Sequence, residues 1–249
     1  MAIRGIFKEE GDLANVELMT TATSIPDQIL PSHASMVHGL LPELGNIEIF
    51  STAGVCLTSL QALKIAYLAV AVGDKENAIC SASELVSATL LSKHYDAEYE
   101  KCHSIGENPY FGFEKDFLRF MLSDGAGAVL LGNKPNDQGL SFKIEWIDMQ
   151  SYANECPVCM LAGGEFNLDG STTSWKMFEN KDFMDKSIFA VKQDIRLLKV
   201  SVSAMLVYTR QKNIAQVFIL ERYFFVSIYP AAIPGTYLAM FLVAVLQLC

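Results

Sequence analysis

Basic residues and histidines are scarce in this chain of 249 residues. It holds 19 lysines and arginines against 28 aspartates and glutamates, which gives a formal net charge of −9. This surplus of negative charge argues against nucleic acids and anionic membranes as partners, because both present phosphate groups. The histidines are His33, His38, His94 and His103, so none follows residue 103.

Cysteine is too sparse for a disulfide framework, since only six residues are spread along the chain. The first residues do not show the basic and apolar pattern of a signal peptide, so we expect a cytoplasmic protein with reduced thiols. Cys156 and Cys159 form a single Cys-x-x-Cys pair. A zinc site needs four ligands and no second pair exists, so we expect this pair to pack in the fold and to bind no metal.

Charge is also missing from the end of the chain. Residues 1–198 hold 15 basic and 27 acidic side chains, whereas residues 199–249 hold four basic side chains and one acidic side chain. Residues 223–249 hold no charged side chain. The uncharged run is long enough to span a bilayer, although Pro230, Pro234 and Gly235 interrupt it. A membrane anchor is one interpretation. We favour the other, an altered or out-of-frame end that would expose apolar surface and promote aggregation.

The length of 249 residues is enough for one or two domains, and the hydrophobic content of 51% argues against a disordered chain. We expect strands over residues 16–23, 47–52, 77–82 and 141–149, and a small-residue turn leading into a buried strand over 123–132. We expect helices over residues 33–41, with Ser32 as the cap, over 57–72 and over 178–198. Residues 92–114 are polar and predict a surface loop. Several strands are apolar on both faces, which predicts a mostly parallel α/β sheet with helices on both sides.

Cys56 lies where an apolar, strand-like run meets a strong helical pattern. The run Ile47–Cys56 ends in small residues, and Leu57, Leu60 and Leu63 then recur at helical spacing. The amino end of a helix carries partial positive charge and unpaired N–H groups, so it favours a thiolate over a thiol. The pattern predicts a cysteine nucleophile. A buried core thiol is the alternative when the cysteine is considered alone.

Three segments, in this order, resemble β-ketoacyl-acyl-carrier-protein synthases of type III, which belong to the thiolase-like superfamily. Thr20–Asp27 is similar to the strand and turn that precede the nucleophile in that family. Ala53–Cys56 is similar to its nucleophile turn, and Leu122–Gly132 is similar to its Gly-Asp-Gly-Ala-Gly-Ala strand. Ser83-Glu84 falls where the family has a small residue followed by glutamate. The resemblance extends over roughly residues 16–150.

The resemblance implies a thiolase-like α/β fold. Residues 12–198 would form an incomplete N-terminal half of it, and residues 199–249 would be an unmatched apolar tail. It implies that Cys56 takes an acyl group from acyl-CoA and that this group is condensed with malonyl-acyl carrier protein in fatty-acid or polyketide synthesis. The family uses no metal or redox cofactor. Its members pair as homodimers, so a second copy of the chain is an expected partner.

The chain also departs from the family. Decarboxylation of the malonyl group in that family uses a histidine and an asparagine from the second half of the fold, but no histidine follows His103. The sequence from about Lys199 shows no match to that half, and only about 15 residues precede the Thr-rich strand. We therefore expect a truncated chain that cannot complete the reaction. The alternative is a catalytically inactive remnant or a dimerisation module.

Overall fold

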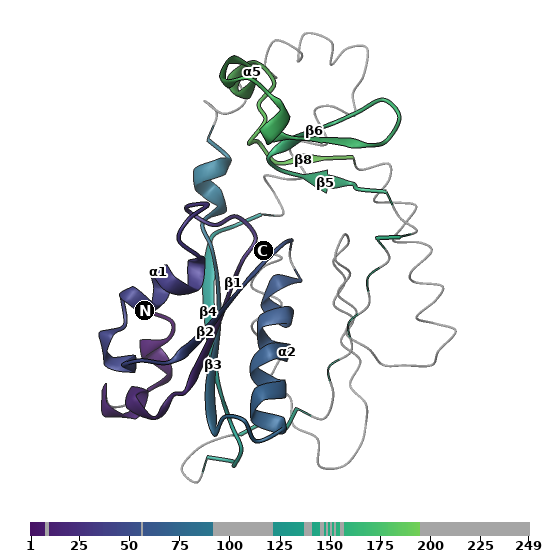
Figure 1. Cartoon of the computed structure of the whole chain (residues 1–249). Helices are drawn as coiled ribbons and strands as arrows, with labels where there is room; N and C mark the ends of the chain where they lie inside the picture. The colour runs from purple at the N-terminus through teal and green to yellow at the C-terminus, as the bar shows by residue number, and fades with distance from the viewer. Residues whose placement is uncertain are drawn as a thin grey trace. The chain divides into compact units, whose positions relative to one another are not determined.

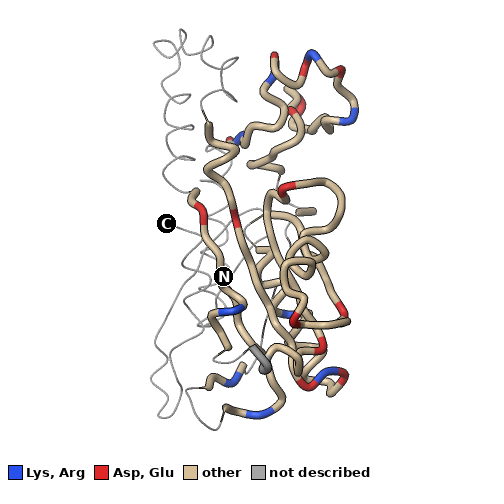
Figure 2. Tube along the Cα trace, turned by 90° about the vertical axis from the view of Figure 1, so that its left-hand side faces the viewer, with Lys and Arg blue, Asp and Glu red and all other residues tan. Residues whose placement is uncertain are grey.

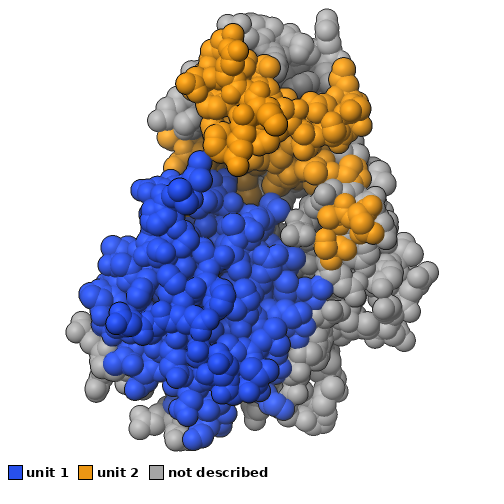
Figure 3. Space-filling model, in the orientation of Figure 1, with its two compact units in different colours: residues 1–84, 124–149, 230–247 blue, residues 85–123, 150–229, 248–249 orange. Residues whose placement is uncertain are grey.

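The computed structural model describes residues 1–7, 10–55, 57–91, 122–136, 141–144, 147, 149, 151, 153–154 and 157–194. These residues belong to two compact units, coloured separately in Figure 3. The described part of the first unit lies within residues 1–84 and 124–149, and that of the second within residues 85–123 and 150–194.

The first unit is built on a four-stranded sheet with the strand order β2-β1-β3-β4 (Figure 1). The strands are β1 (Leu18–Thr23), β2 (Glu48–Ala53), β3 (Asn77–Glu84) and β4 (Gly125–Gly132). β1 runs parallel to both β2 and β3, whereas β4 runs antiparallel to β3. This arrangement confirms the predicted mostly parallel sheet and adds an antiparallel strand at its edge.

Helix α2 (Thr58–Ala71) covers one face of the sheet. Leu18 and Ala22 of β1 pack there against Ala62 and Ala66, which are both 0% exposed. The small alanine side chains let the helix lie close to the strands. Helix α2 ends before Gly73, whose φ of +78° suits the glycine that commonly follows a helix. The predicted helix over residues 57–72 is therefore confirmed.

The opposite face of the sheet is covered by helix α1 (His33–Gly39) and three short 3-10 helices. The 3-10 helices are η1 (Arg4–Ile6), η2 (Glu10–Asn15) and η3 (Pro42–Leu44). Met19 and Ile79 point from the strands into this layer and are fully buried with Leu13. Each such side chain contributes about 1.5–3 kcal/mol of hydrophobic stabilisation. The Ser32 hydroxyl accepts a hydrogen bond from the Ser35 N–H at 3.3 Å, so the predicted cap of α1 is confirmed.

Charged residues of the four-stranded sheet stand only at strand ends, where Glu48 opens β2 and Glu84 closes β3. Figure 2 colours the basic and acidic residues along the described chain trace. The strand over residues 123–132 is present as β4, but the expectation that it is buried is wrong. Within β4 only Leu131 is buried, because this strand lies at the edge of the described sheet.

Two other predictions are wrong. The described residues among 141–149 form no strand. Ile144 and Ile147 instead pack against the core beneath α2, and their spacing of three does not suit a strand, whose side chains alternate. Of the helix predicted over residues 178–198, the described residues 178–194 form only α5 (Asn180–Asp185). The chain turns at Ser187, which has a φ of +47°, and buries Ile188.

The second unit contains two small antiparallel sheets. β5 (Met160–Leu161) pairs with β8 (Lys192–Gln193), and β6 (Gly164–Phe166) pairs with β7 (Thr172–Ser174). The short 3-10 helices η4 (Val86–Thr89) and η7 (Trp175–Met177) also fall in this unit. The ammonium group of Lys192 joins the two sheets, because it forms an ion pair with Glu165 at 2.5 Å and donates to the carbonyl oxygen of Gly164 at 3.2 Å.

In the part of the chain that the structure describes, no helix is long and apolar enough to cross a membrane. Residues 199–249, for which we considered a membrane anchor and an altered end, lie outside the described residues. The loop predicted over residues 92–114 also lies outside them. The division at residues 12–198 and 199–249 therefore stays a prediction.

Candidate functional site

The candidate site lies at the edge of the sheet where the three parallel strands end. The register pairs Thr23 with Ala53 and Ala22 with Ala82, so the carboxyl ends of β1, β2 and β3 meet there. Open α/β sheets commonly bind ligands at this edge. Cys56 follows the end of β2 by three positions. It lies outside the described residues, so we build the site from the neighbours on either side.

Gly54 shapes the turn that leaves β2. Its φ of +154° is a backbone conformation that residues with a side chain rarely adopt. A Cβ atom at this position would also lie 3.3 Å from the Cγ2 atom of Thr58. The N–H of Thr58 donates to the carbonyl oxygen of Val55 at 3.0 Å and closes a turn over residues 55–58. A glycine is therefore needed at position 54 to bring the chain into this turn.

The turn leads directly into the amino end of α2. The carbonyl oxygen of Leu57 accepts hydrogen bonds from the N–H groups of Leu60 and Gln61 at 3.0 and 3.1 Å. The side chain of Leu57, the N-cap residue, forms no capping hydrogen bond, and Leu57 and Thr58 are 4% and 1% exposed. The amino end of a helix carries a partial positive charge, which stabilises a nearby anion. The position of this helix end beside the turn therefore suits a thiolate.

Thr52 joins the two sides of the turn, which the sequence did not predict. Its hydroxyl lies 2.9 Å from the carbonyl oxygen of Thr58 and 3.3 Å from that of Thr21. The strand and the first turn of α2 are thereby connected across residues 53–57. The sequence signal that could have indicated this contact is a threonine on the α2 face of β2, six residues before the start of the helix.

Glu84 connects two of the strand ends. One carboxylate oxygen accepts the backbone N–H of Ser24 at 2.5 Å, and the other accepts the hydroxyl of Thr23 at 3.4 Å. The carboxylate therefore holds the turn after β1 against the end of β3. The resemblance had singled out Ser83-Glu84, and the structure shows that Glu84 organises this edge of the sheet.

The two described histidines both have partners within the first unit. The Nε2 atom of His33 lies 3.1 Å from the Ser83 hydroxyl. The Nε2 atom of His38 lies 2.9 Å from the carbonyl oxygen of Gly45, to which it donates. His94 and His103 lie outside the described residues. Each described histidine thus supports a local contact of helix α1 with its surroundings.

Cys80 shows how a structural cysteine differs from the one predicted to react. It lies within β3 and is 6% exposed. Burial raises the pKa of its thiol to about 11, and a hydrogen bond with Thr20 offsets only part of this rise. The Cys80 side chain therefore stays protonated at neutral pH. Cys159 is also buried, whereas Cys156 lies outside the described residues. Among the residues with described positions, no cluster of His, Cys, Asp and Glu could hold a metal ion.

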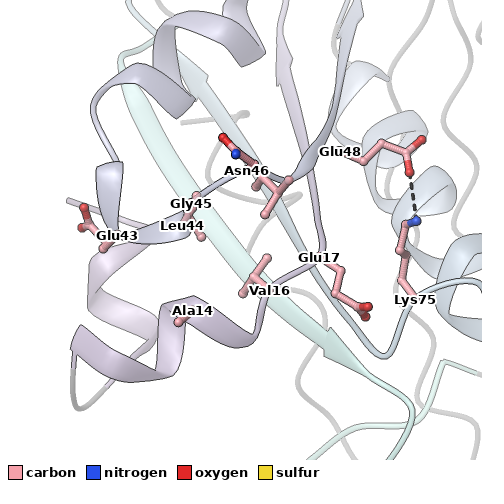
Figure 4. Close-up of a pocket in the computed structure, with 10 residues that line it drawn as sticks. Ala14, Val16, Glu17, Glu43, Leu44, Gly45, Asn46, Glu48 and Lys75 are labelled. Carbon is pink, nitrogen blue, oxygen red and sulfur yellow. Dashed lines mark ion pairs between the residues drawn. The ribbon is translucent and has the colours of Figure 1, made fainter.

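A hollow of about 550 Å³ lies at the opposite edge of the sheet, where the parallel strands begin (Figure 4). The ammonium group of Lys75 forms ion pairs there with Glu48 at 3.1 Å and with Asp74 at 3.2 Å, and these contacts raise its pKa. A carboxylate oxygen of Glu17 accepts the N–H groups of Glu76 and Asn77 at 2.5 and 3.4 Å. These charged groups hold the turn after α2 against the start of the strands. The hollow is separate from the β2–α2 turn.

The chain resembles solved structures that include two synthases of type III. A 3-oxoacyl-(acyl-carrier-protein) synthase III is 13% identical with a TM-score of 0.51, and the match covers 80% of this chain and 52% of that one. A β-ketoacyl-[acyl carrier protein] synthase III from Thermus thermophilus is 19% identical with a TM-score of 0.46, covering 81% and 50%. A variant of OleA from Xanthomonas campestris is 21% identical with a TM-score of 0.40, covering 48% and 35%.

No protein-family model and no curated protein sequence matches the chain. The chain spans about half the length of the two synthases and about a third of OleA. At these identities the likeness concerns the fold alone. The mixed sheet, the helices on its two faces and the match to the first synthase agree. Over the matched part, the chain shares the α/β fold of that synthase.

Proposed function

We propose that this chain accepts an acyl group from an acyl-CoA thioester on Cys56, as the first step of a condensing-enzyme reaction. The observation that carries the proposal is the turn between β2 and α2. In the sequence, position 56 falls between β2, which ends at the sheet edge where open α/β sheets commonly bind ligands, and the amino end of the 14-residue helix α2. The fold is that of condensing enzymes, which supports the same reading.

The proposed step requires a thiolate. Cys56 first loses its proton to water, and the partial positive charge at the helix end favours this loss. The sulfur then attacks the thioester carbonyl carbon and forms a new C–S bond, while the carbonyl electrons move to the oxygen. The partial positive charge at the amino end of α2 stabilises that oxyanion. The oxyanion collapses and breaks the C–S bond to coenzyme A, whose thiolate leaves and takes a proton from water. The product is a thioester on Cys56.

Condensation with malonyl-acyl carrier protein is a separate step, and we assign only the acyl transfer to the residues of this chain. The decarboxylating step needs groups that stabilise the carbanion formed when carbon dioxide leaves. His33 and His38 each have a local partner. We therefore propose that the acyl thioester accumulates on the isolated chain.

Mass spectrometry of the full chain tests this proposal. The protein is incubated with acetyl-CoA and with longer saturated acyl-CoAs, and the modified residue is located by peptide mapping. We expect an acyl adduct on Cys56 that is absent in Cys56→Ala and retained in the matched control Cys80→Ala. The proposal is wrong if the wild-type chain gains no adduct, or if the adduct persists in Cys56→Ala.

A dimerisation module is the second candidate function. It is favoured by the outer strand β2, because Phe50 is 42% exposed on the α2 face of a strand at the edge of the described sheet. An apolar side chain at such an edge suits contact with a second copy of the chain. Light scattering with size-exclusion chromatography should show a dimer that Phe50→Lys dissociates. A monomeric wild-type chain would refute this role.

A further inference from the structure

The inference concerns Thr52, which stands on the α2 face of β2. The register places Thr52 opposite Ala22, whose side chain packs beneath α2. Because side chains alternate along a strand, Thr52 shares this face and points towards the helix. The side chain is half-buried, so its hydroxyl can find only part of its hydrogen bonding in water. The structure shows which groups it contacts instead.

The Thr52 hydroxyl brings three elements together. It lies 2.9 Å from the carbonyl oxygen of Thr58 in the first turn of α2, and 3.3 Å from that of Thr21 in β1. A hydroxyl has one proton to donate, so the shorter contact to Thr58 is the stronger one. The edge strand, the central strand and the start of the helix are thereby held at one point.

This contact closes a short loop in the chain. Thr52 and Thr58 are six residues apart, and Cys56 lies between them in the sequence. Within the loop, Gly54 has the φ of +154° described above, and Val55 accepts a hydrogen bond from the N–H of Thr58. The Thr52–Thr58 contact is the side-chain bond that fixes the helix start relative to the strand end. The backbone on either side of position 56 is anchored through it.

We propose that Thr52 is a positioning residue for the Cys56 thiolate. This inference rests on the proposed function of Cys56. The influence of a helix end on a nearby charge falls off within the first turn, so a small displacement of the helix start weakens the stabilisation of a thiolate. The Thr52 hydroxyl prevents that displacement. Its removal leaves a cysteine at the same place in the sequence with a higher pKa and a slower reaction.

Thr20 provides a matched control for this proposal. Its hydroxyl donates to the carbonyl oxygen of Ala62 at 3.0 Å, so it also joins a strand to α2. The Ala62 contact lies one turn further along the helix than Thr58. A purely structural role for Thr52 predicts that Thr52→Val and Thr20→Val alter the protein in the same way. A positioning role predicts that only Thr52→Val changes the titration of Cys56.

The experiment measures the rate of iodoacetamide alkylation of Cys56 against pH, residue by residue, with peptide mass spectrometry. Buried Cys80 in the same sample reports on folding, because it reacts only when the chain opens. In Thr52→Val we expect the midpoint of the Cys56 profile to rise by about one pH unit and the rate at pH 7 to fall about tenfold. Thr52→Ser keeps the hydroxyl and should restore the wild-type profile, and Thr20→Val should leave it unchanged.

Two results would overturn the inference. One is a Cys56 profile in Thr52→Val that coincides with the wild type, and the other is an equal shift in Thr20→Val. Thr52→Ala replaces Thr52→Val if Cys80 becomes reactive in the valine variant. Failure of the proposed function would be seen differently, as a wild-type chain that acyl-CoA does not modify while the alkylation profiles still differ between variants.

Discussion

The two edges of the four-stranded sheet are built from different interactions. At the edge where the parallel strands begin, the half-buried Lys75 lines an open hollow and forms ion pairs with the exposed side chains of Glu48 and Asp74. At the edge where they end, hydroxyl and backbone groups fasten the turns, and Glu84 is the charged residue that closes β3. Exposed ion pairs contribute little to stability, whereas backbone geometry at a tight turn tolerates few changes. We therefore expect mutations to have unequal effects at the two edges.

Gly54→Val should give the largest effect. The new side chain would meet the Thr58 side chain and force a φ that suits glycine, which costs about 1–3 kcal/mol of unfolding free energy. Acylation of Cys56 should be lost as well. Urea denaturation and mass spectrometry measure the two effects. Gly39→Ala is the matched control, because a Cβ atom there meets nothing within 4 Å. Equal stabilities of the two variants would contradict the comparison.

Cys80, between the two edges, makes stability depend on alkaline pH. Its folded pKa of about 11 lies above the value of an exposed thiol, so the folded state holds the proton more tightly than the unfolded state. The contribution is fully present below the unfolded pKa and is lost as the pH rises through about 11. Urea midpoints measured from pH 8 to 11 should fall less in Cys80→Ala than in the wild type. Parallel curves for the two proteins would refute this assignment.

Glu84→Gln should have a smaller effect. The amide keeps one oxygen acceptor but turns an N–H₂ group towards a donor, which costs about 1–2 kcal/mol when the site is half-buried. Glu17→Gln is the matched change at the other edge, since Glu17 also accepts backbone N–H groups but is exposed. We expect a clear drop in the urea midpoint for Glu84→Gln and a slight drop for Glu17→Gln. The reverse order would refute the proposed difference between the edges.

Lys75→Ala should have the smallest effect. Its partners Glu48 and Asp74 are exposed, so water and salt screen both ion pairs. Because these contacts raise the pKa of Lys75, their contribution is present below the unfolded pKa of lysine and is lost only as the pH rises above it. We expect no measurable change in the urea midpoint at pH 7 and 0.5 M salt. A large loss of stability would show that the ion pairs of Lys75 stabilise the first unit strongly, which would contradict the expected difference between the two edges.

Much of the sheet could be predicted because its signals are local. The Thr-rich strand predicted over residues 16–23, the apolar run predicted as a strand over residues 47–52 and the leucine spacing of α2 each indicate one element, and all three elements were confirmed. The prediction of a helix over residues 178–198 was wrong. The sequence there is amphipathic, which is typical of a helix, but the chain turns at Ser187 and buries Ile188. The preference for a helix is weak compared with the burial of apolar side chains, so the tertiary fold decided the outcome.

The candidate site was predictable only in part. The place of Cys56 between strand and helix follows from neighbouring residues, and its role as the acyl acceptor stays a prediction. The contact of Thr52 with Thr58 and the bonds of Glu84 to the turn after β1 depend on distances in space. Such distances leave no periodicity in the sequence, and Thr52 looks like any threonine in a strand. The hollow near Lys75 was unpredictable for the same reason.

The central position of β1 has a consequence for amide hydrogen exchange. All six residues of this strand are buried, and it is paired on both sides by parallel strands. Its N–H groups should exchange with deuterium only when the whole first unit unfolds, whereas those of β2, the outer strand of the described sheet, can exchange through local opening. Protection from exchange should therefore be highest in β1 and lower in β2, the strand that precedes the turn into α2.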